Sequence, residues 1–313
     1  MKCNSYLVEI CFSLASLFMM SLAKTYYCSG KLKGTFYCSY QPGKNNSRII
    51  VNAPHGGDLQ PKNIPDRDVG CYSKQNKTCI WNHNCGEKNK DKCSAIPRQD
   101  YYATEIATML VDKIKNLTGQ KPYFIINNVH RVKFDANREI HEATFDVPEA
   151  EKVFEQYHGY IKKAMKSVRS PGLFIDVHCH CHDQKWIEVG YLIGKVDLKL
   201  KTFVPKQTSI RALLKHSKYS LERILRGDKS LGYYLQEEGY NTIPSPKNRF
   251  AEVETESYFK GGYNMREYGS KDKGDIDAIQ FEIPEILCTK EKGPGVASAI
   301  ARSIVKWMRD HYD

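Results

Sequence analysis

The spacing of apolar residues along the chain predicts both strands and helices. Short apolar runs rich in β-branched and aromatic residues predict strands at 48–53, 123–126, 173–177, 186–193 and 278–283. Apolar residues that recur at helical spacing predict helices over 103–114, 148–168 and 300–308. Pro148 suits the first turn of the second helix, and Asp100 is placed to cap the N-terminus of the first.

The alternation of these strands and helices is typical of an α/β fold. Strands that are apolar throughout are buried on both faces, so we expect a mixed, mostly parallel sheet with helices on both faces. No internal repeat, low-complexity tract or linker interrupts the pattern. We therefore expect a single domain over residues 24–313, with a polar, cysteine-rich insertion at about 71–93.

The N-terminus has the organisation of a signal peptide. Lys2 precedes an apolar run over 11–20, and the small residues Ser21 and Ala23 fit the pattern before a cleavage site. The run is shorter than the ~20 apolar residues that a membrane-spanning helix needs, although an uncleaved anchor is the alternative. We therefore expect residues 1–23 to be a signal peptide and the mature protein to be secreted and extracellular, with no membrane span.

The cysteines support an oxidising compartment. The chain has 11 cysteines, of which Cys3 and Cys11 lie in the expected signal peptide, so an odd number remains and one is left without an intrachain partner. A cluster in a polar segment is typical of disulfides, and we expect four residues to pair among themselves: Cys71, Cys79, Cys85 and Cys93. Their spacing lacks the CxxC pairs of structural zinc sites. Glycosylation sequons at Asn45, Asn76 and Asn116 also agree with a secreted glycoprotein.

The charge of the chain bears on its partners. The formal net charge is +11, which favours anionic partners such as a small anionic substrate, an acidic peptide or glycan, or a lipid surface. The Lys and Arg residues are scattered and form no block, and together with secretion this argues against nucleic acid as the partner. A solvated basic surface without a specific partner is the simpler alternative.

The segment 176–183 is rich in histidine and directly follows a predicted strand. Alternate residues of an extended backbone share a face, so His178, His180 and His182 can point the same way. Ligand sites in parallel α/β sheets lie at the carboxyl ends of strands, which makes a metal site as good an interpretation as a polar rim of histidines. Cys179 and Cys181 belong to the opposite face, where we expect them to be buried or disulfide-bonded.

His55 follows another predicted strand, in the turn Pro54-His55-Gly56-Gly57-Asp58. His55, Asp58 and His178 would give three ligands and leave a fourth position open, as catalytic zinc requires. Asp58 could instead cap the turn, and Asp66 and Asp100 are alternative acidic ligands.

Two further positions suggest substrate and proton chemistry. Arg138 beside Asn137 suits binding of a carboxylate, with a structural ion pair from Arg138 to Glu139 or Glu142 as the alternative. Glu282 shares a face of an otherwise apolar strand with Gln280, and a carboxylate in such a place suits a general base. Glu285 is the neighbouring alternative.

Taken together, these motifs resemble the N-formylglutamate amidohydrolase family, whose members look like distant relatives of zinc carboxypeptidases. The resemblance runs through most of the chain and rests on these segments: 54–57 with 64–67, 130–131, 135–138, 176–178, 188–191, 261–263 with 268–269, and 280–282. It implies that His55 and His178 bind zinc, that Asn137 and Arg138 hold a substrate carboxylate, and that Glu282 is the general base. Zinc carboxypeptidases have Glu where this chain has Asp58.

The function that follows is a secreted zinc-dependent hydrolase that cleaves an amide bond next to a carboxylate, as in an N-acyl amino acid. Two alternatives remain open. The chain could be a secreted binding or matrix protein on the same fold, or a zinc carboxypeptidase that acts on peptides.

Overall fold

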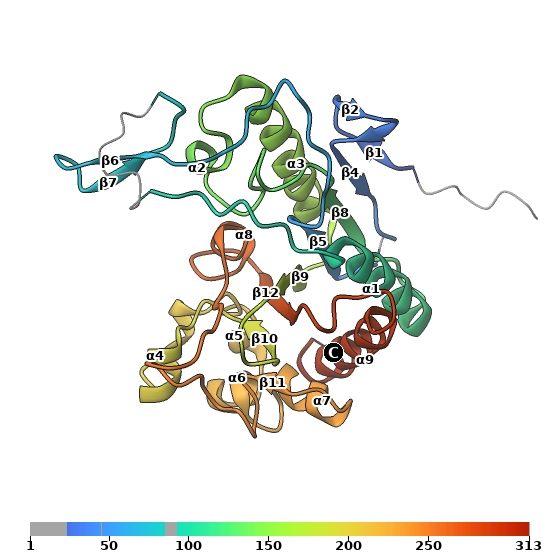
Figure 1. The fold of residues 1–313 in the computed structure, drawn as a ribbon. Helices are drawn as coiled ribbons and strands as arrows, with labels where there is room; N and C mark the ends of the chain where they lie inside the picture. The colour runs from blue at the N-terminus through green and yellow to red at the C-terminus, as the bar shows by residue number, and fades with distance from the viewer. Residues whose placement is uncertain (1–23, 45, 85–92, 313) are drawn as a thin grey trace, which may run out of the picture.

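A mixed sheet of eight strands runs through the centre of the computed structural model, which describes residues 24–44, 46–84 and 93–312 (Figure 1). In spatial order the strands are β1 (Tyr26–Tyr27), β4 (Cys38–Gln41), β8 (Tyr123–Asn127), β5 (Ile49–Ala53), β9 (Gly172–His180), β12 (Ile276–Pro284), β10 (Ile187–Gly190) and β11 (Thr242–Ile243). The central strands β8, β5, β9 and β12 are parallel, whereas β4 and β10 run antiparallel to their inner neighbours. The predicted fold class is confirmed: a mixed, mostly parallel sheet with helices on both faces.

Helices cover both faces of this sheet with separate apolar cores. The first core lies under α1 (Ala103–Thr118), α6 (Leu221–Arg226), α7 (Leu231–Glu237) and α9 (Gly293–His311). The second lies under α3 (Pro148–Ser167) and α8 (Tyr263–Tyr268). The remaining short helices are α2 (Ile140–Thr144), α4 (Lys195–Leu200), the 3-10 turn η2 (Pro205–Gln207) and α5 (Leu213–His216). No helix among the described residues is long and apolar enough to cross a membrane.

The sheet face toward α3 and α8 changes from apolar to polar near the carboxyl ends of its strands. In β9, Phe174 belongs to the core under α3, and Asp176 and His178 follow on the same face because side chains alternate. In β12, Ala278 is followed in the same way by Gln280 and Glu282. A band of buried polar side chains therefore lies at one end of an otherwise apolar face.

Two small hairpins lie outside the main sheet. One consists of β2 (Lys31–Leu32) and β3 (Thr35–Phe36), between the disulfide-bonded Cys28 and Cys38. The other, β6 (Cys71–Ser73) and β7 (Thr78–Ile80), belongs to the predicted insertion and projects away from the sheet (Figure 1).

The disulfides confirm part of the cysteine prediction. Cys79 bonds Cys93, and Cys71 is also disulfide-bonded, whereas Cys85 lies outside the described residues. Cys179 forms a disulfide with Cys288, 109 residues away in sequence, which agrees with the expectation that it is buried or disulfide-bonded. The expectation for Cys181 is wrong, since it is an exposed free thiol. The expected signal peptide and the sequon residue Asn45 also lie outside the described residues.

Candidate metal centre and surrounding pocket

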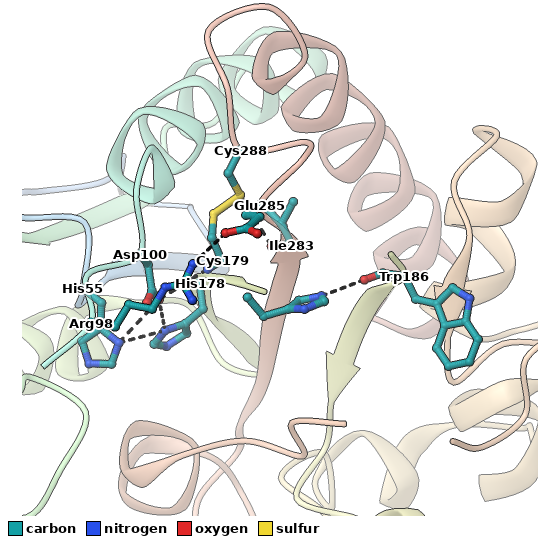
Figure 2. Close-up of a disulfide and its surroundings, with 10 residues drawn as sticks. His55, Arg98, Asp100, His178, Cys179, Trp186, Ile283, Glu285 and Cys288 are labelled. Atoms are coloured by element: carbon teal, nitrogen blue, oxygen red, sulfur yellow. Dashed lines mark hydrogen bonds and ion pairs between the residues drawn. A yellow bond between two sulfur atoms is a disulfide. The ribbon is translucent and has the colours of Figure 1, made fainter. Parts of the chain in front are cut away.

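Three side chains from distant parts of the chain converge at the carboxyl ends of β5 and β9. Nδ1 of His55 lies 3.1 Å from Nδ1 of His178, and Oδ2 of Asp100 lies 3.5 Å and 2.8 Å from these two nitrogens. All three residues are buried. Figure 2 shows them facing one another beside the Cys179–Cys288 disulfide.

The chain path explains why these residues meet. After β5 the chain passes through α1 to β8 on one side of β5, and through α3 to β9 on the other side. The carboxyl ends of β5 and β9 therefore lie at a topological switch point, where α/β sheets form ligand sites. The backbone N–H of Asp100 donates to the carbonyl of His55, which holds the start of α1 against the His55 turn. Gly57 is required in this turn, because a Cβ there would come within 2.2 Å of the backbone of Asn128.

The three donor atoms fit a metal ion. Ligand bonds of about 2.0–2.2 Å in a tetrahedral site place donor atoms roughly 3.3 Å apart, close to the separations of 2.8–3.5 Å in this cluster. Two imidazoles and a carboxylate are also a common donor set for catalytic metals, with a fourth position left for water or substrate. The residues present can therefore hold a metal ion.

Each imidazole is oriented from behind by a second carboxylate. Nε2 of His55 lies 2.6 Å from Oδ1 of Asp135, and Nε2 of His178 lies 3.2 Å from Oδ2 of Asp176. A carboxylate that accepts from Nε2 leaves Nδ1 as the ligand nitrogen and raises the basicity of the ring. His55 and His178 therefore both present Nδ1 to the cluster, because a carboxylate lies beside Nε2 of each ring.

The two orienting carboxylates are themselves held firmly. Asp135 accepts a hydrogen bond from Nε of Arg131 at 2.8 Å and from Nη2 of Arg67 at 3.4 Å. Asp176 accepts from the side-chain amides of Asn52 at 2.7 Å and Asn264 at 3.2 Å. This network fixes the ligand geometry before any ligand arrives.

Charge within the cluster shifts its pKa values strongly. Burial opposes ionisation of Asp100, but the neighbouring His55 and His178 outweigh it and hold the pKa of this carboxyl well below its usual range. Burial likewise opposes ionisation of Asp135, and Arg131 and His55 outweigh it to lower the pKa of that carboxyl. Burial disfavours the charged form of His178, yet Asp176 and Glu282 raise its pKa well above the usual value. The cluster thus favours a positive charge between its carboxylates, which a metal ion can supply.

A pocket of ≈ 320 Å³ opens beside the cluster, and Glu282 lines it. In the register of β9 and β12, Glu282 lies opposite His178. Nε2 of Gln280 donates to Oε1 of Glu282 at 2.8 Å, and Oε1 of Gln280 accepts from the backbone N–H of Gly262. Burial, against the opposing effect of His178, raises the pKa of Glu282 to about 8. A buried carboxyl with raised basicity, beside a candidate metal cluster, suits proton transfer.

The acidic ligand that the structure brings to the cluster is Asp100, the alternative to Asp58. Asp58 and Asp66 are both exposed and lie outside the group of candidate ligands, and Asp66 pairs with Lys133. Asp100 is also not the N-cap of α1, which begins at Ala103 after Tyr102 in a left-handed conformation. The side chain expected to cap a helix instead faces the two histidines.

The residues expected to bind a carboxylate lie in the pocket wall, but with other partners. Arg138 donates Nε to Glu142 at 2.8 Å, which is the structural ion pair weighed as the alternative. The amide of Asn137 lies 3.2 Å from Nε2 of His178 and accepts from the backbone N–H of Asn264. Asn137 therefore packs beside the ligand ring, and both Asn137 and Arg138 contribute to the pocket lining.

Sequence reasoning missed several residues of this site. Asp135 lies in the motif that predicts roles for Asn137 and Arg138, but no local feature of the sequence marks it as the partner of His55. Arg98 and Arg131 also line the pocket, and they add positive charge beside Arg138. Arg131 belongs to the segment 130–131 that contributes to the family resemblance, but no role followed for it from the sequence, and it comes shortly after the end of β8, as His55 comes shortly after the end of β5.

Comparison with known proteins gives distant structural similarity only. No family model matches the chain, and no curated protein matches it. Among solved structures, the chain is similar to N-formylglutamate amidohydrolase from Ralstonia eutropha JMP134, with 10% identity, a TM-score of 0.45, and coverage of 91% of this chain and 97% of that one. It is also similar to a gene product from Agrobacterium tumefaciens (12% identity, TM-score 0.45, 86% and 93% covered). A third match is a metallo-carboxypeptidase from Burkholderia cenocepacia (11% identity, TM-score 0.38, 95% and 67% covered).

The resemblance to N-formylglutamate amidohydrolases that the motifs indicate is thus found again among the solved structures. Similarity at this level assigns neither a family nor an activity, so the functional conclusion depends on the geometry of the site.

Proposed function

We propose that the protein is a secreted, zinc-dependent hydrolase that cleaves an amide bond next to a carboxylate, with an N-acyl amino acid as the substrate class. The observation that supports this most directly is the placement of Glu282 in the wall of the pocket that the His55, Asp100 and His178 cluster also lines. Hydrolysis of an amide needs an activated water, a polarised carbonyl and a group that takes up a proton, and these residues could supply all three.

The proposed roles follow from the contacts of each residue. His55, Asp100 and His178 would hold zinc, which when bound supplies a Lewis acid for the carbonyl and lowers the pKa of water. Glu282 would take the proton from the attacking water, and Gln280 keeps the carboxyl of Glu282 turned in place by its hydrogen bond. Asp135 and Asp176 would hold the two ligand rings.

Arginines explain the preference for a carboxylate. Arg98, Arg131 and Arg138 all line the pocket, and a guanidinium is the side chain best suited to a planar anion. Arg131 donates through Nε to Asp135 and through Nη1 to the carbonyl of Arg98. Arg138 donates through Nε to Glu142 and through Nη1 to the carbonyl of Asn137, so Nη2 of each is the nitrogen that would meet a ligand. Arg98 already donates to Cys181 and Glu285, so it would contribute mainly its charge. An acidic substrate would also be attracted by the net charge of +11.

The pocket favours a small substrate over a long peptide. Its volume of ≈ 320 Å³ lies at the lower end of the ~300–1,000 Å³ that is usual for small-molecule sites. The exposed apolar side chains of Ile96 and Phe259 stand at its lining and suit an apolar acyl group. Secretion is supported by the disulfides.

Elemental analysis and substrate screening of the full chain, purified without a histidine tag, test this function. We expect about one zinc ion per chain, bound by His55, Asp100 and His178, and hydrolysis of N-acyl amino acids. His178→Ala should lose the metal. Arg138→Lys keeps the charge but loses the planar fork, so it should raise KM for a substrate with a free carboxylate more than for the same substrate as its carboxamide.

Arg223→Lys is the matched control, because Arg223 makes a two-pronged ion pair with Asp228 on the surface, outside the pocket. It should leave both KM values unchanged. A wild type that binds zinc and an acidic ligand tightly but hydrolyses no N-acyl amino acid or peptide would support the alternative of a binding protein. Release of C-terminal residues from long peptides at higher rates than from N-acyl amino acids would instead favour a carboxypeptidase.

A further inference from the structure

A second carboxylate lies behind the wall of the same pocket. Glu188 of β10 is completely buried. Its Oε2 accepts from the backbone N–H of Phe259 at 2.7 Å, and its Oε1 lies 2.7 Å from Nδ1 of His182. Among the described residues, its ion-pair partners are imidazoles, His182 and the more distant His180 at 3.8 Å. A carboxylate removed from water in this way needs a cationic or strongly donating partner.

His182 is the member of this pair that reaches the pocket. Its side chain is 15% exposed and lines the pocket, and its ring packs against Phe259 with centroids 4.4 Å apart. Nδ1 is directed at Glu188, while Nε2 has no hydrogen-bond partner among the residues that the structure describes. The ring nitrogen left for a ligand is therefore Nε2, in an orientation fixed by Glu188.

The pair stands on the far side of Glu282 from the metal cluster. In the register of the sheet, Glu282 lies opposite His178 of β9 on one side and opposite Glu188 of β10 on the other. The three strands are neighbours, about 4.8 Å apart. A substrate bound beside Glu282 would thus have the ligand cluster on one side and His182 on the other.

His180 differs from His182 in its hydrogen bonds, which argues against a second metal site here. Its Nδ1 accepts from the backbone N–H of His182 at 3.1 Å, so its proton is on Nε2, and Nε2 donates to the carbonyl of Trp186 at 2.9 Å. Both nitrogens are therefore engaged, whereas a metal ligand needs a free lone pair. His180 braces the loop that presents His182.

We propose that Glu188 and His182 form a second acid–base pair of the pocket, in which Nε2–H of His182 donates a proton to the leaving nitrogen of the substrate. This role rests on the proposed function. With Nδ1–H donated to Glu188, a proton on Nε2 makes the ring an imidazolium whose charge the buried carboxylate balances. Nucleophilic hydrolases also use a buried carboxylate to orient an imidazole that transfers a proton. In this pocket the imidazole would give that proton to the leaving nitrogen.

The step conserves protons and electrons. The water oxygen forms a bond to the carbonyl carbon while Glu282 takes one water proton. When the C–N bond breaks, its electron pair passes to nitrogen, which accepts the proton from Nε2 of His182. The products are a carboxylic acid and an amine, and transfer of the proton from Glu282 to His182 restores both residues.

The test compares leaving groups in one variant. An alkylamine must be protonated to leave, whereas a p-nitrophenolate leaves without a proton. His182→Gln in the full-length zinc-loaded protein should therefore lower kcat for an N-acyl amino acid by roughly 10²- to 10⁴-fold, with KM little changed. It should lower kcat for the matching p-nitrophenyl ester far less. A purely structural role would slow both substrates alike.

His141→Gln is the matched control, since His141 pairs with Asp146 at the same 2.7 Å but is exposed and lies outside the pocket. It should change neither rate. If His182→Gln does not fold, Glu188→Gln tests the same proton path. It keeps a side-chain oxygen that accepts from the backbone N–H of Phe259, but it removes the negative charge beside His182. An equal loss of kcat on the amide and the ester would overturn the acid–base pair. So would two zinc ions in the wild type with one lost in His182→Gln. Either result would leave the proposed hydrolase function standing. No hydrolysis by the wild type would instead reject the proposed function.

Discussion

Strand β12 has a buried carboxyl near each end, and the two have different surroundings. Asp277 lies near its start and Glu282 near its carboxyl end. Burial raises the pKa of Asp277 to about 6, and burial, opposed by His178, raises the pKa of Glu282 to about 8. The same strand and the same physical cause thus give two carboxyl groups whose pKa values are raised above the ordinary values.

Asp277 and Glu282 differ in the groups that surround them. Asp277 accepts hydrogen bonds from the hydroxyls of Ser270 at 2.6 Å and Tyr312 at 2.8 Å and from the backbone N–H of Ala212 at 3.1 Å, and no cationic side chain among the described residues forms an ion pair with it. Among the described residues, Glu282 has one side-chain hydrogen bond, from Gln280, and it lies beside His178 in a pocket. A buried carboxyl with its acceptor sites filled stabilises the fold, whereas one with an open side and charged neighbours is available for chemistry.

The largest expected effect separates these two carboxyls by activity. Glu282→Gln removes the proton acceptor but keeps the shape and the hydrogen bond to Gln280, so turnover should fall by roughly 10²- to 10⁴-fold with metal content and folding unchanged. Asp277→Asn should leave turnover within about 2-fold, because the start of β12 is remote from the pocket. Steady-state kinetics and metal analysis of both variants measure this. An equal loss of turnover in both would mean that Glu282 has no special role.

The next effect concerns the carboxylate behind the metal cluster. Asp135→Asn leaves the buried guanidinium groups of Arg67 and Arg131 without their counter-charge and weakens the acceptor of His55. We expect the affinity for zinc to fall roughly 10- to 100-fold and the free energy of unfolding of the metal-free protein to fall by about 3–5 kcal/mol. Zinc competition titration and urea unfolding give the two values.

Asp146→Asn is the control for this variant. Asp146 also pairs with an imidazole, that of His141 at 2.7 Å, but both side chains are about half exposed or more. Its loss should change the free energy of unfolding by less than about 1 kcal/mol and leave zinc affinity unchanged. If the two variants behaved alike, the orienting role of Asp135 would be wrong.

The smallest effect is a pH dependence at the other end of β12. Because the pKa of Asp277 is about 6 when folded and 3.8 is its ordinary value, the folded state holds a proton that the unfolded state releases. The contribution of Asp277 to stability is therefore fully present below about pH 4 and is lost as the pH rises to about 6. We therefore expect that, between pH 4 and pH 7, the free energy of unfolding of Asp277→Asn rises relative to that of the wild type by up to roughly 3 kcal/mol, as measured by urea unfolding. A constant difference across this range would contradict the raised pKa.

The sequence alone was sufficient for the central strands and the long helices. The predicted runs at 48–53, 123–126, 173–177 and 278–283 match β5, β8, β9 and β12 within a few residues, because parallel strands buried on both faces are apolar throughout. It was not sufficient for β1, β4 and β11, which lie at or near the sheet edges, or for the short helices α4 to α8. An edge strand of two residues has no periodicity, and a helix of seven residues or fewer has no complete amphipathic repeat.

The sequence also determined two of the three candidate metal ligands. His55 and His178 were identifiable because each follows an apolar strand, and strand ends in such sheets converge. Which acid joins them was decided only by tertiary structure. Asp58, Asp66 and Asp100 have the same chemistry and equally polar local contexts, and Asp100 reaches the cluster because the chain returns past the cysteine-rich insertion and bonds its backbone to the carbonyl of His55. Asp135 depends on tertiary structure in the same way, since a buried charge is defined by partners such as Arg67, 68 residues away in sequence. A local pattern can predict where a side chain points, but not which distant partner it meets.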